Sequence, residues 1–304
     1  MSERKPNIAV IGAGLMGHGI AQVFALAGHD VTIYDAAQAS LDTVKERISA
    51  NLKDLGDDAR AVERVTPQAD LAAAVRDADY VVEAVLEDLP LKQKLFGEIE
   101  QHVRPDTILA SNTSVIPITD IMKGLKRRER ALGTHWWNPP FLVPLVEVIE
   151  TEWTSADAVA FTMKLHADAG KQPAHVKKDV PGFIGNRLQH ALWREAVSLV
   201  EHGICDAETV DNVIKAAFGR RIAVLGPLEN ADMVGTDLTL AIHKTVLPAI
   251  DSRPGPSPYL EKLVADGKLG FKTGEGFRKW TPEQQAELRS KVVKHLKKAR
   301  ANDA

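Results

Sequence analysis

The sequence of 304 residues has a single cysteine, Cys205, so no internal disulfide framework can form. It also lacks any apolar run near the roughly 18 residues that a membrane-spanning helix requires. The first residues, MSERKPN, contain no apolar core of a secretory signal. From these absences we expect a soluble cytoplasmic protein without a membrane partner, in which Cys205 is a small half-buried side chain rather than a nucleophile.

An excess of charge of one sign is also missing, because 38 Lys and Arg residues nearly balance 41 Asp and Glu residues, for a net charge of -3. A nucleic-acid-binding surface requires a marked excess of clustered Lys and Arg side chains. We therefore expect no nucleic-acid partner, and we expect no bound metal. The length is sufficient for two domains with separate cores.

The most informative stretch that is present covers residues 7–35. An apolar run over 8–11 predicts a buried parallel strand, and apolar residues at helical intervals over 20–27 predict a helix. Between them, Gly12, Gly14 and Gly17 have the spacing G-x-G-x-x-G. Glycines in this context indicate a dinucleotide-binding turn rather than an ordinary glycine-rich loop.

Each position of this turn has a physical task. Gly12 permits the tight change from strand to helix, Gly14 lets the backbone approach a pyrophosphate, and Gly17 lets the helix pack closely on the strand. The free N–H groups at the start of the helix, where Leu15 and Met16 stand, would face the phosphates and favour negative charge.

Asp35 closes the second strand of this unit, over residues 31–34, about 20 residues after the glycines. Its carboxylate is placed to accept hydrogen bonds from the hydroxyls of the adenosine ribose. The same negative charge would repel a 2′-phosphate, so we predict NAD rather than NADP as the cofactor.

Strand and helix patterns then alternate as far as residue 176, with strands expected at 79–82 and 107–110 and one or two helices over 38–60. This alternation predicts an α/β fold with a Rossmann-type, doubly wound, mainly parallel sheet. From Phe183 onward only helical patterns remain. We therefore expect an NAD-binding domain over 1–180 and an all-helical C-terminal domain over 181–304, which ends in a charged, solvated helix over 291–304.

Ligands of such sheets bind at the carboxyl ends of the strands. Three polar clusters fall there: Glu83 and Glu87 with Lys92, the sequence SNTS at 111–114, and HWWNPP at 135–140, which leads to Glu147. Glu83 is the weakest of these candidates, because a cap of the following turn would explain it equally well.

These motifs together resemble the 3-hydroxyacyl-CoA dehydrogenase superfamily. The matching segments are Gly-Leu-Met-Gly at 14–17, SNTS at 111–114, HWWNPP with Glu147 twelve residues after His135, PGFIGNR at 181–187 and KTGEGF at 272–277. The resemblance covers essentially the whole chain, with the motifs in the right order.

The resemblance implies roles for individual residues. His135 would be the general base, Glu147 would hold its imidazole, and Ser114 and Asn186 would bind the substrate oxygens. Besides the glycine turn and Asp35, the residues expected to contact NAD are Glu87, Lys92, Ser114, Asn138 and Lys272. The neighbouring Arg187 could equally be a surface or interdomain ion-pair residue.

The chemistry of the residues agrees with these roles. Oxidation of a secondary alcohol needs a base that titrates near neutral pH, which imidazole provides. A carboxylate beside the imidazole would raise its pKa and fix its tautomer. Such a base typically contributes about 10²–10⁴ to the rate.

Departures from the family pattern bear on the substrate. Family members that act on thioesters usually show HFFNP and a longer, more basic helical hairpin after the second strand, whereas residues 36–64 here are compact and balanced in charge. The sequence looks closer to branches that act on small free acids, such as gulonate (lambda-crystallin-like), carnitine and pyridine-carboxylate dehydrogenases. We favour a small 3-hydroxy acid. A short 3-hydroxyacyl-CoA thioester and a catalytically idle, crystallin-like NAD-binding protein remain as alternatives.

Two further hypotheses concern surfaces. Trp136, Trp137 and Trp193 could form an aromatic wall that binds a substrate cation, although aromatic side chains near active sites more often serve packing. The helical domain is expected to form a homodimer, because family members do so and its apolar faces exceed what one small bundle can bury.

Overall fold

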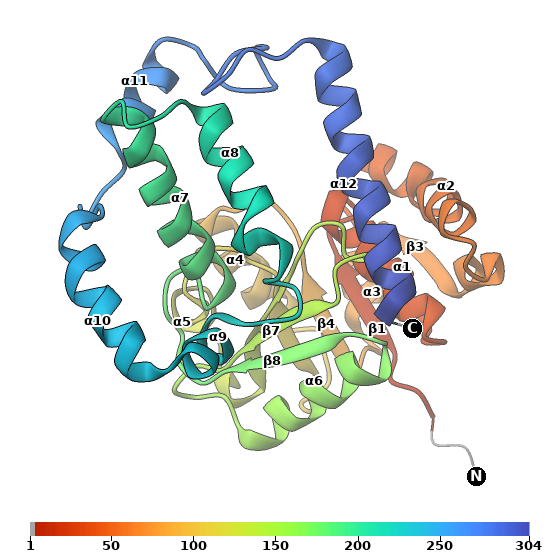
Figure 1. Ribbon diagram of the computed structural model, residues 1–304. Helices are drawn as coiled ribbons and strands as arrows, with labels where there is room; N and C mark the ends of the chain where they lie inside the picture. The colour runs from red at the N-terminus through yellow and green to blue at the C-terminus, as the bar shows by residue number, and fades with distance from the viewer. Residues whose placement is uncertain (1–3, 304) are drawn as a thin grey trace. The chain divides into compact units, whose positions relative to one another are not determined.

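Figure 1 shows the fold of the protein, a computed structural model that describes residues 4–303. Eight strands form one sheet in the order β3-β2-β1-β4-β5-β6-β7-β8. Their bounds are β1 (Ile8–Ile11), β2 (Val31–Tyr34), β3 (Val65–Gln68), β4 (Tyr80–Glu83), β5 (Ile108–Ser111), β6 (Ala131–Trp136), β7 (Leu145–Ile149) and β8 (Gln172–Val176).

The first six strands are parallel and have the order 3-2-1-4-5-6 of a doubly wound dinucleotide-binding sheet. β7 is antiparallel to β6, because the short connection over 137–144 contains no crossover helix, and β8 is parallel to β7. The predicted fold class, a mainly parallel doubly wound sheet followed by helices, is confirmed.

Helices cover both faces of the sheet. Side chains alternate along each strand, so Ile8 and Val10 of β1 join one apolar core while Ala9 and Ile11 join the other. The first core also contains side chains of α1 (Leu15–Leu26), α2 (Gln38–Leu55) and α6 (Ala156–Asp168), and the second those of α3 (Leu71–Val75), α4 (Leu89–Ile99) and α5 (Ile118–Met122). Two short 3-10 helices, η1 (Ala59–Arg64) and η2 (Arg128–Arg130), complete this part.

The rest of the described chain is helical. Its elements are α7 (Gly185–Glu201), α8 (Ala207–Ala216), η3 (Phe218–Arg220), α9 (Pro227–Val234), α10 (Thr236–Val246), η4 (Leu247–Ala249), α11 (Pro258–Ala265) and α12 (Pro282–Asp303). The chain divides into two compact units, which we call the sheet unit and the helical unit. The helical unit is Leu188–Val292, and the sheet unit takes in the chain up to Arg187 and again from Val293. The border expected at residue 180 stays a prediction, because the division by contacts describes compactness and not the limits of the domains.

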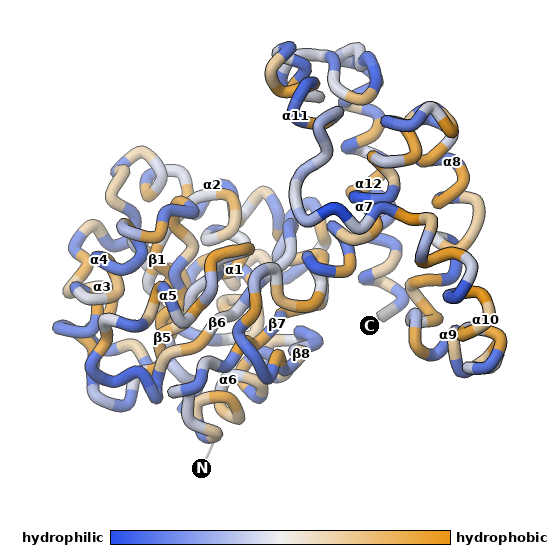
Figure 2. The backbone as a smooth tube through the Cα atoms, turned by 90° about the vertical axis from the view of Figure 1, so that its left-hand side faces the viewer, coloured by the Kyte–Doolittle hydropathy of each residue, from blue (hydrophilic) through white to orange (hydrophobic). Residues whose placement is uncertain are grey.

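The helical unit buries few side chains. Among the described residues 188–292, only Ser198, Val210 and Leu263 are buried. Hydrophobic stretches lie along α8, α9 and α10 in Figure 2, and Leu228 and Leu240 are 80% and 56% exposed. Much of the apolar surface of this unit therefore stays exposed in the single chain.

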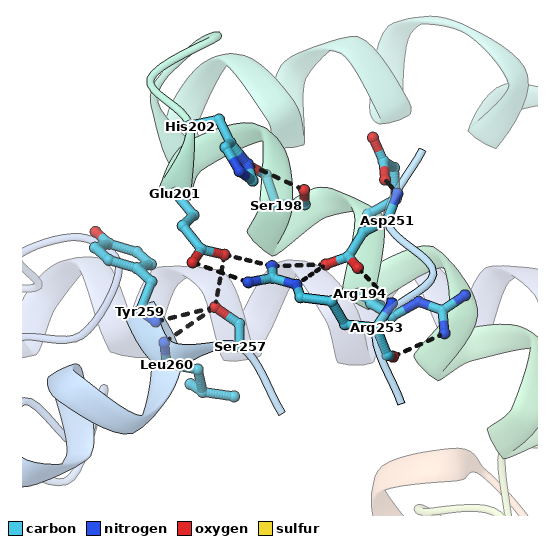
Figure 3. Close-up of polar contacts among 10 residues, drawn as sticks. Arg194, Ser198, Glu201, His202, Asp251, Arg253, Ser257, Tyr259 and Leu260 are labelled. Atoms are coloured by element: carbon cyan, nitrogen blue, oxygen red, sulfur yellow. Dashed lines mark hydrogen bonds and ion pairs between the residues drawn. The ribbon is translucent and has the colours of Figure 1, made fainter. Parts of the chain in front are cut away.

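A cluster of ion pairs holds the segment before α11 against α7 (Figure 3). The Arg253 guanidinium donates to both oxygens of Glu201, at 3.1 and 2.5 Å, and to Oδ2 of Asp251 at 2.7 Å. Ser257 donates to Glu201 at 3.0 Å, and the N–H of Asp251 donates to Glu195 at 2.7 Å. Polar contacts thus fasten this loop where apolar packing is sparse.

The charged C-terminal segment was expected to be a solvated helix end, and this is wrong for its last turns. Lys297 pairs with Asp54 at 2.7 Å, and Arg300 donates to both oxygens of Asp57 at 3.0 and 2.9 Å. The end of α12 belongs to the sheet unit because these cations meet acidic side chains at the end of α2 and just after it.

Candidate active site

The glycine turn between β1 and α1 is open toward a ligand. Gly12 has φ of +106°, and a Cβ there would lie 2.6 Å from the carbonyl oxygen of Ala84, while a Cβ at Gly17 would lie 1.7 Å from that of Gly12. At Gly14, in contrast, the space that a Cβ would fill is empty. No side chain caps α1, so the first N–H groups of the helix remain free for an anion. The turn therefore fits the diphosphate of a dinucleotide.

Asp35 lies beside this turn. Its Oδ2 accepts the N–H of Ala13 at 2.7 Å, and its Oδ1 accepts the N–H of Ala37 at 2.8 Å. Each carboxylate oxygen can accept more than one hydrogen bond, so ribose hydroxyls can still bind there. Two backbone hydrogen bonds thus hold the Asp35 carboxylate next to the glycines.

A buried ion-pair network lies at the end of β4. The ammonium of Lys92, which is fully buried, is 2.6 Å from Oε1 of Glu83 and 3.3 Å from Oε2 of Glu87. Glu83 is also buried and accepts hydrogen bonds from the Ser111 hydroxyl at 2.6 Å and the N–H of Val85 at 2.7 Å. Glu83 is therefore an anchor of the strand ends, more than a cap of the following turn. The ammonium of Lys92 is itself buried, but its partner Glu87 is partly exposed at the site.

Glu87 holds the loop that follows β5. Its Oε1 accepts the Thr113 hydroxyl at 2.5 Å and the N–H groups of Ser114 and Val115 at 2.8 and 3.2 Å. Burial acts to raise the pKa of Glu87, but these hydrogen bonds and the charge of Lys92 outweigh it and lower the pKa. An ionised Glu87 thus fixes the position of Ser114.

His135 and Glu147 form a buried pair across β6 and β7. The two residues are directly opposite in the antiparallel register, so their side chains share one face of the sheet. Nδ1 of His135 is 2.7 Å from Oε2 of Glu147, and the residues are only 4% and 1% exposed. Within residues 4–303, no group hydrogen-bonds to Nε2 of His135.

The other oxygen of Glu147 holds the start of α7. Oε1 accepts the N–H groups of Ile184 and Gly185 at 2.8 and 3.0 Å. Burial acts to raise the pKa of Glu147, but the hydrogen bonds from His135 and these two N–H groups together lower it. Glu147 is therefore held as a carboxylate, which keeps a proton on Nδ1 of His135.

Aromatic rings enclose the imidazole. The ring centroids of Trp137 and Phe183 are 5.3 and 5.5 Å from that of His135. A Cβ at Gly185 would lie 2.4 Å from the Trp137 ring, so the indole rests directly on the backbone where α7 begins. The packing leaves no room for a larger residue at position 185.

The hypothesis of an aromatic wall is wrong for Trp136. Successive side chains of a strand point to opposite faces, so Trp136 faces away from His135, into the core against Phe24 and His166. Trp193 lies in the helical unit, half exposed and against His190. Of the three tryptophans, only Trp137 contacts the imidazole.

Of the remaining candidate residues, Asn186 contacts another site residue, whereas the other three are exposed. Asn186 donates from Nδ2 to the carbonyl oxygen of Ser114 at 2.9 Å, which joins the loop after β5 to the start of α7. Asn138 is exposed just after β6. Lys272 is exposed and belongs to the helical unit. Arg187 is exposed and has no ion pair among the described residues.

Several contributing residues were not among the site residues expected from the sequence. Ser111 and Thr113 bind the two glutamates, and Asn112 accepts the backbone N–H of Trp136 at 2.9 Å. The SNTS motif marked this loop but not the partner of each side chain. Arg47 of α2, which contacts the glycine turn, carried no local signal at all.

The described residues contain neither a metal-binding cluster nor a membrane-spanning helix. Between residues 4 and 303, no three His, Cys, Asp or Glu side chains are grouped so that they could hold a metal ion. None of the helices in the same range is both long and apolar enough to cross a bilayer.

Comparison with known proteins identifies relatives over nearly the whole chain. Residues 7–180 match the family described as 3-hydroxyacyl-CoA dehydrogenase, NAD binding domain, and residues 182–280 match the C-terminal domain of the same family. A 5-formyl-3-hydroxy-2-methylpyridine 4-carboxylate 5-dehydrogenase of Mesorhizobium japonicum is 38% identical over 295 residues, or 95% of this chain and 96% of that protein.

Solved structures agree with these matches. A crystal structure of a 5-formyl-3-hydroxy-2-methylpyridine 4-carboxylic acid 5-dehydrogenase, described as an NAD+-dependent dismutase, superimposes with a TM-score of 0.91 at 36% identity, over 99% of both chains. A (S)-3-hydroxybutyryl-CoA dehydrogenase from Ralstonia eutropha has a TM-score of 0.77 at 32% identity, over 91% of this chain and all of the other.

Proposed function

Because this chain belongs to the 3-hydroxyacyl-CoA dehydrogenase family and is an NAD-dependent dehydrogenase, we propose that it oxidises the secondary hydroxyl of a small free hydroxy acid. The observation that carries this proposal is the buried pair of His135 and Glu147. Their 2.7 Å contact occupies Nδ1, so the lone pair of Nε2 can accept a proton.

The proposed reaction uses His135 as the general base. The O–H bond of the substrate breaks and its proton moves to Nε2, while the C–H bond breaks with its electron pair and a C=O bond forms. NAD, when bound, accepts that electron pair as a hydride. Glu147 stabilises the positive charge that the imidazole gains. Asn186, which uses one of its two N–H groups on Ser114, can donate the other to a substrate oxygen.

We assign cofactor contacts on the same basis. The open glycine turn supports contacts from its five residues, namely Gly12, Gly14, Leu15, Met16 and Gly17, and Asp35 is placed for the ribose. Glu87, Ser114 and Asn138 are at the carboxyl ends of β4, β5 and β6, where ligands of such sheets bind. Lys92 is proposed to act through Glu87, and Lys272 remains a candidate from the helical unit.

Structural similarity over the whole chain supports a free acid over a thioester. The pyridine-carboxylate enzyme superimposes with a TM-score of 0.91, whereas the CoA enzyme from Ralstonia eutropha has 0.77 and a 3-hydroxyacyl-CoA dehydrogenase from Archaeoglobus fulgidus, which covers 97% of this chain, has 0.71. The family match ends at residue 280, just before α12 begins at Pro282, so α12 is an addition to the family's C-terminal domain. The short α2–η1 segment, with no second long helix after α2, agrees with this choice.

The Mesorhizobium relative supports a second candidate. The name of that enzyme specifies a formyl group on a ring that also carries a carboxylate. A hydrated aldehyde presents the same H–C–O–H unit as an alcohol, so the base and the hydride acceptor could act on it without further residues. We therefore include ring-bound aldehydes among the substrates to be tested.

The experiment is NADH formation across a panel of free 3-hydroxy acids, sugar acids, carnitine, formyl and hydroxymethyl pyridine carboxylates, and 3-hydroxybutyryl-CoA. We expect turnover of a free acid and little of the thioester. The His135→Asn variant should lose about 10²–10⁴ of the rate and bind NADH normally. A thioester as the best substrate would overturn the substrate class, and full activity of His135→Asn would overturn the base.

We also propose that the helical unit forms a homodimer. The exposed apolar residues of α9 and α10, with three buried residues in the whole unit, form an apolar surface of the kind that marks a protein interface. Sedimentation should show a dimer that Leu228→Glu with Leu240→Glu dissociates. Leu91→Glu, an exposed leucine of the sheet unit, serves as the control and should leave the dimer intact.

A further inference from the structure

Arg47 lies on α2 and reaches the dinucleotide turn. Its Nη2 donates to the carbonyl oxygens of Ala13 at 2.7 Å and Ser40 at 2.9 Å, and its Nη1 donates to that of Gly14 at 3.5 Å. One guanidinium, with five donors in a fixed plane, therefore binds two consecutive carbonyl groups of the turn.

No carboxylate among the described residues pairs with Arg47. The acids near its helix are otherwise engaged, since Asp54 pairs with Lys297, Asp57 with Arg300, and Asp35 accepts backbone N–H groups. Nε of Arg47 is buried and has no partner. A cation that is partly removed from water without a counter-charge is costly. The protein thus leaves a positive charge at this turn uncompensated.

The contacts of Arg47 also orient the turn. In a trans peptide the C=O and N–H groups point in opposite directions. Because the carbonyl groups of Ala13 and Gly14 point toward Arg47, the N–H groups of Gly14 and Leu15 point away from it, toward the open side of the turn. The Gly14 carbonyl also accepts the backbone N–H of His18 at 3.2 Å, and Nδ1 of the His18 ring lies 2.8 Å from it.

His18 does not supply the positive charge of the turn. Burial lowers the pKa of His18, its hydrogen bond to Gly14 acts against this, and the charge of Arg47 lowers the pKa further. His18 is therefore neutral at neutral pH, where Arg47 remains a cation.

We propose that Arg47 is a positioning residue for the cofactor diphosphate: it turns the N–H groups of the glycine turn toward the phosphates and provides the positive charge that they neutralise. The inference rests on the use of NAD by this family and not on the identity of the substrate or the base. The effect of Arg47 should accordingly appear only with ligands that carry the diphosphate.

The test measures dissociation constants by fluorescence titration or calorimetry for NADH, ADP-ribose and adenosine. Arg47→Gln keeps a donor but removes the charge. We expect its affinity for NADH and ADP-ribose to fall by about tenfold, while that for adenosine stays within about twofold. The native affinity for NADH should weaken with added salt, and this dependence should flatten in the variant.

The control is Arg60→Gln. Arg60 is an exposed arginine that pairs with Asp58 and makes no hydrogen bond to the turn. It should bind all three ligands as the native protein does. Unchanged NADH affinity in Arg47→Gln would overturn the proposal, and so would an equal loss for adenosine. If Arg47→Gln does not fold, Arg47→Met, which also removes the charge, is judged by the same comparison of NADH with adenosine.

Discussion

The two units of the chain are stabilised in different ways. In the sheet unit, two apolar cores enclose the sheet, and buried polar groups such as Lys92, Glu83 and Glu147 are each satisfied by hydrogen bonds. In the helical unit, three residues are buried and a partly buried ion cluster around Arg253 holds a loop. A unit with its own cores can support buried charges at a site, whereas a unit without one depends on something that covers it.

The largest effect should come from the polar network of the sheet unit. Glu147→Gln keeps the shape of the side chain but removes its charge, so the proton on Nδ1 of His135 is no longer fixed and the imidazolium is no longer stabilised. We expect turnover to fall on the order of 10²-fold or more, with the dissociation constant of NADH nearly unchanged. Steady-state rates and NADH titration measure this.

The pH dependence of Glu147 follows from the same contacts. Its pKa is below the ordinary value, so the stability that its ionised form contributes is fully present above the unfolded pKa of about 4.3. This contribution is lost as the pH falls through the lower folded value, and Glu147→Gln should lose that acid dependence. Equal turnover of the variant and the native enzyme would show that this carboxylate serves the fold alone.

A second prediction tests packing in the sheet unit. Gly185→Ala places a Cβ 2.4 Å from the Trp137 ring, which must shift and so disturb its contact with His135. Overpacking of this kind costs about 1–3 kcal/mol, and we expect turnover to fall about tenfold. Trp137→Phe in the same background should recover part of the stability, because the smaller ring relieves the contact.

The control for this pair is Gly97→Ala in α4, where a Cβ meets nothing within 4 Å. It should stabilise the protein by about 0.5–1 kcal/mol, since alanine is the better helix former. If Gly185→Ala and Trp137→Phe have independent effects in thermal unfolding, the indole does not rest on Gly185 as described.

A third prediction concerns the helical unit. Arg253→Gln removes the cation shared by Glu201 and Asp251, and we expect a lower melting temperature with little change in NADH binding. Hydrogen bonds from Arg253 lower the pKa of Asp251 to about 2, and those from Arg253 and Ser257 lower that of Glu201. The stability that these ionised acids contribute is fully present above their unfolded pKa values near 4. It is lost as the pH falls toward 2.

Melting temperatures of the native protein and Arg253→Gln, measured between about pH 2 and 7, should therefore converge at the acid end. Arg221→Gln, a charged residue of the same unit for which no ion pair is present among the described residues, is the matched control. A difference that persists at the acid end would mean that Arg253 stabilises the unit through packing rather than through its charge.

The sequence predicted much of the sheet unit because its signals are local. The glycine turn, Asp35 and the buried strands depend on a few adjacent residues, and the structure shows the fold class that they indicate. His135 and Glu147, twelve residues apart in the sequence, also lie directly opposite each other, because no crossover helix lies between β6 and β7.

What could not be predicted depends on residues far apart in the sequence. Arg47 binds a turn more than thirty residues away through a side chain whose neighbours suggest only a solvated helix face. Lys92 was expected to contact NAD, yet its buried ammonium pairs with both Glu83 and Glu87. Trp136 and Trp137 looked alike, although the alternation of β6 sends them to opposite sides.

The smallest effect should come from the end of α12, which the two-unit comparison assigns to the sheet unit. Arg300→Gln removes the two hydrogen bonds to Asp57, and since both groups are near the surface we expect a loss below about 1 kcal/mol. Hydrogen exchange should nevertheless rise over the last turns of α12 and leave α7 unchanged.

Burial, followed by the charge of Arg300, lowers the pKa of Lys171 to about 8, so this pKa should rise slightly in the variant. If exchange rises equally in α12 and α7, the end of α12 behaves as part of the helical unit, and Arg300 does not fasten it to α2.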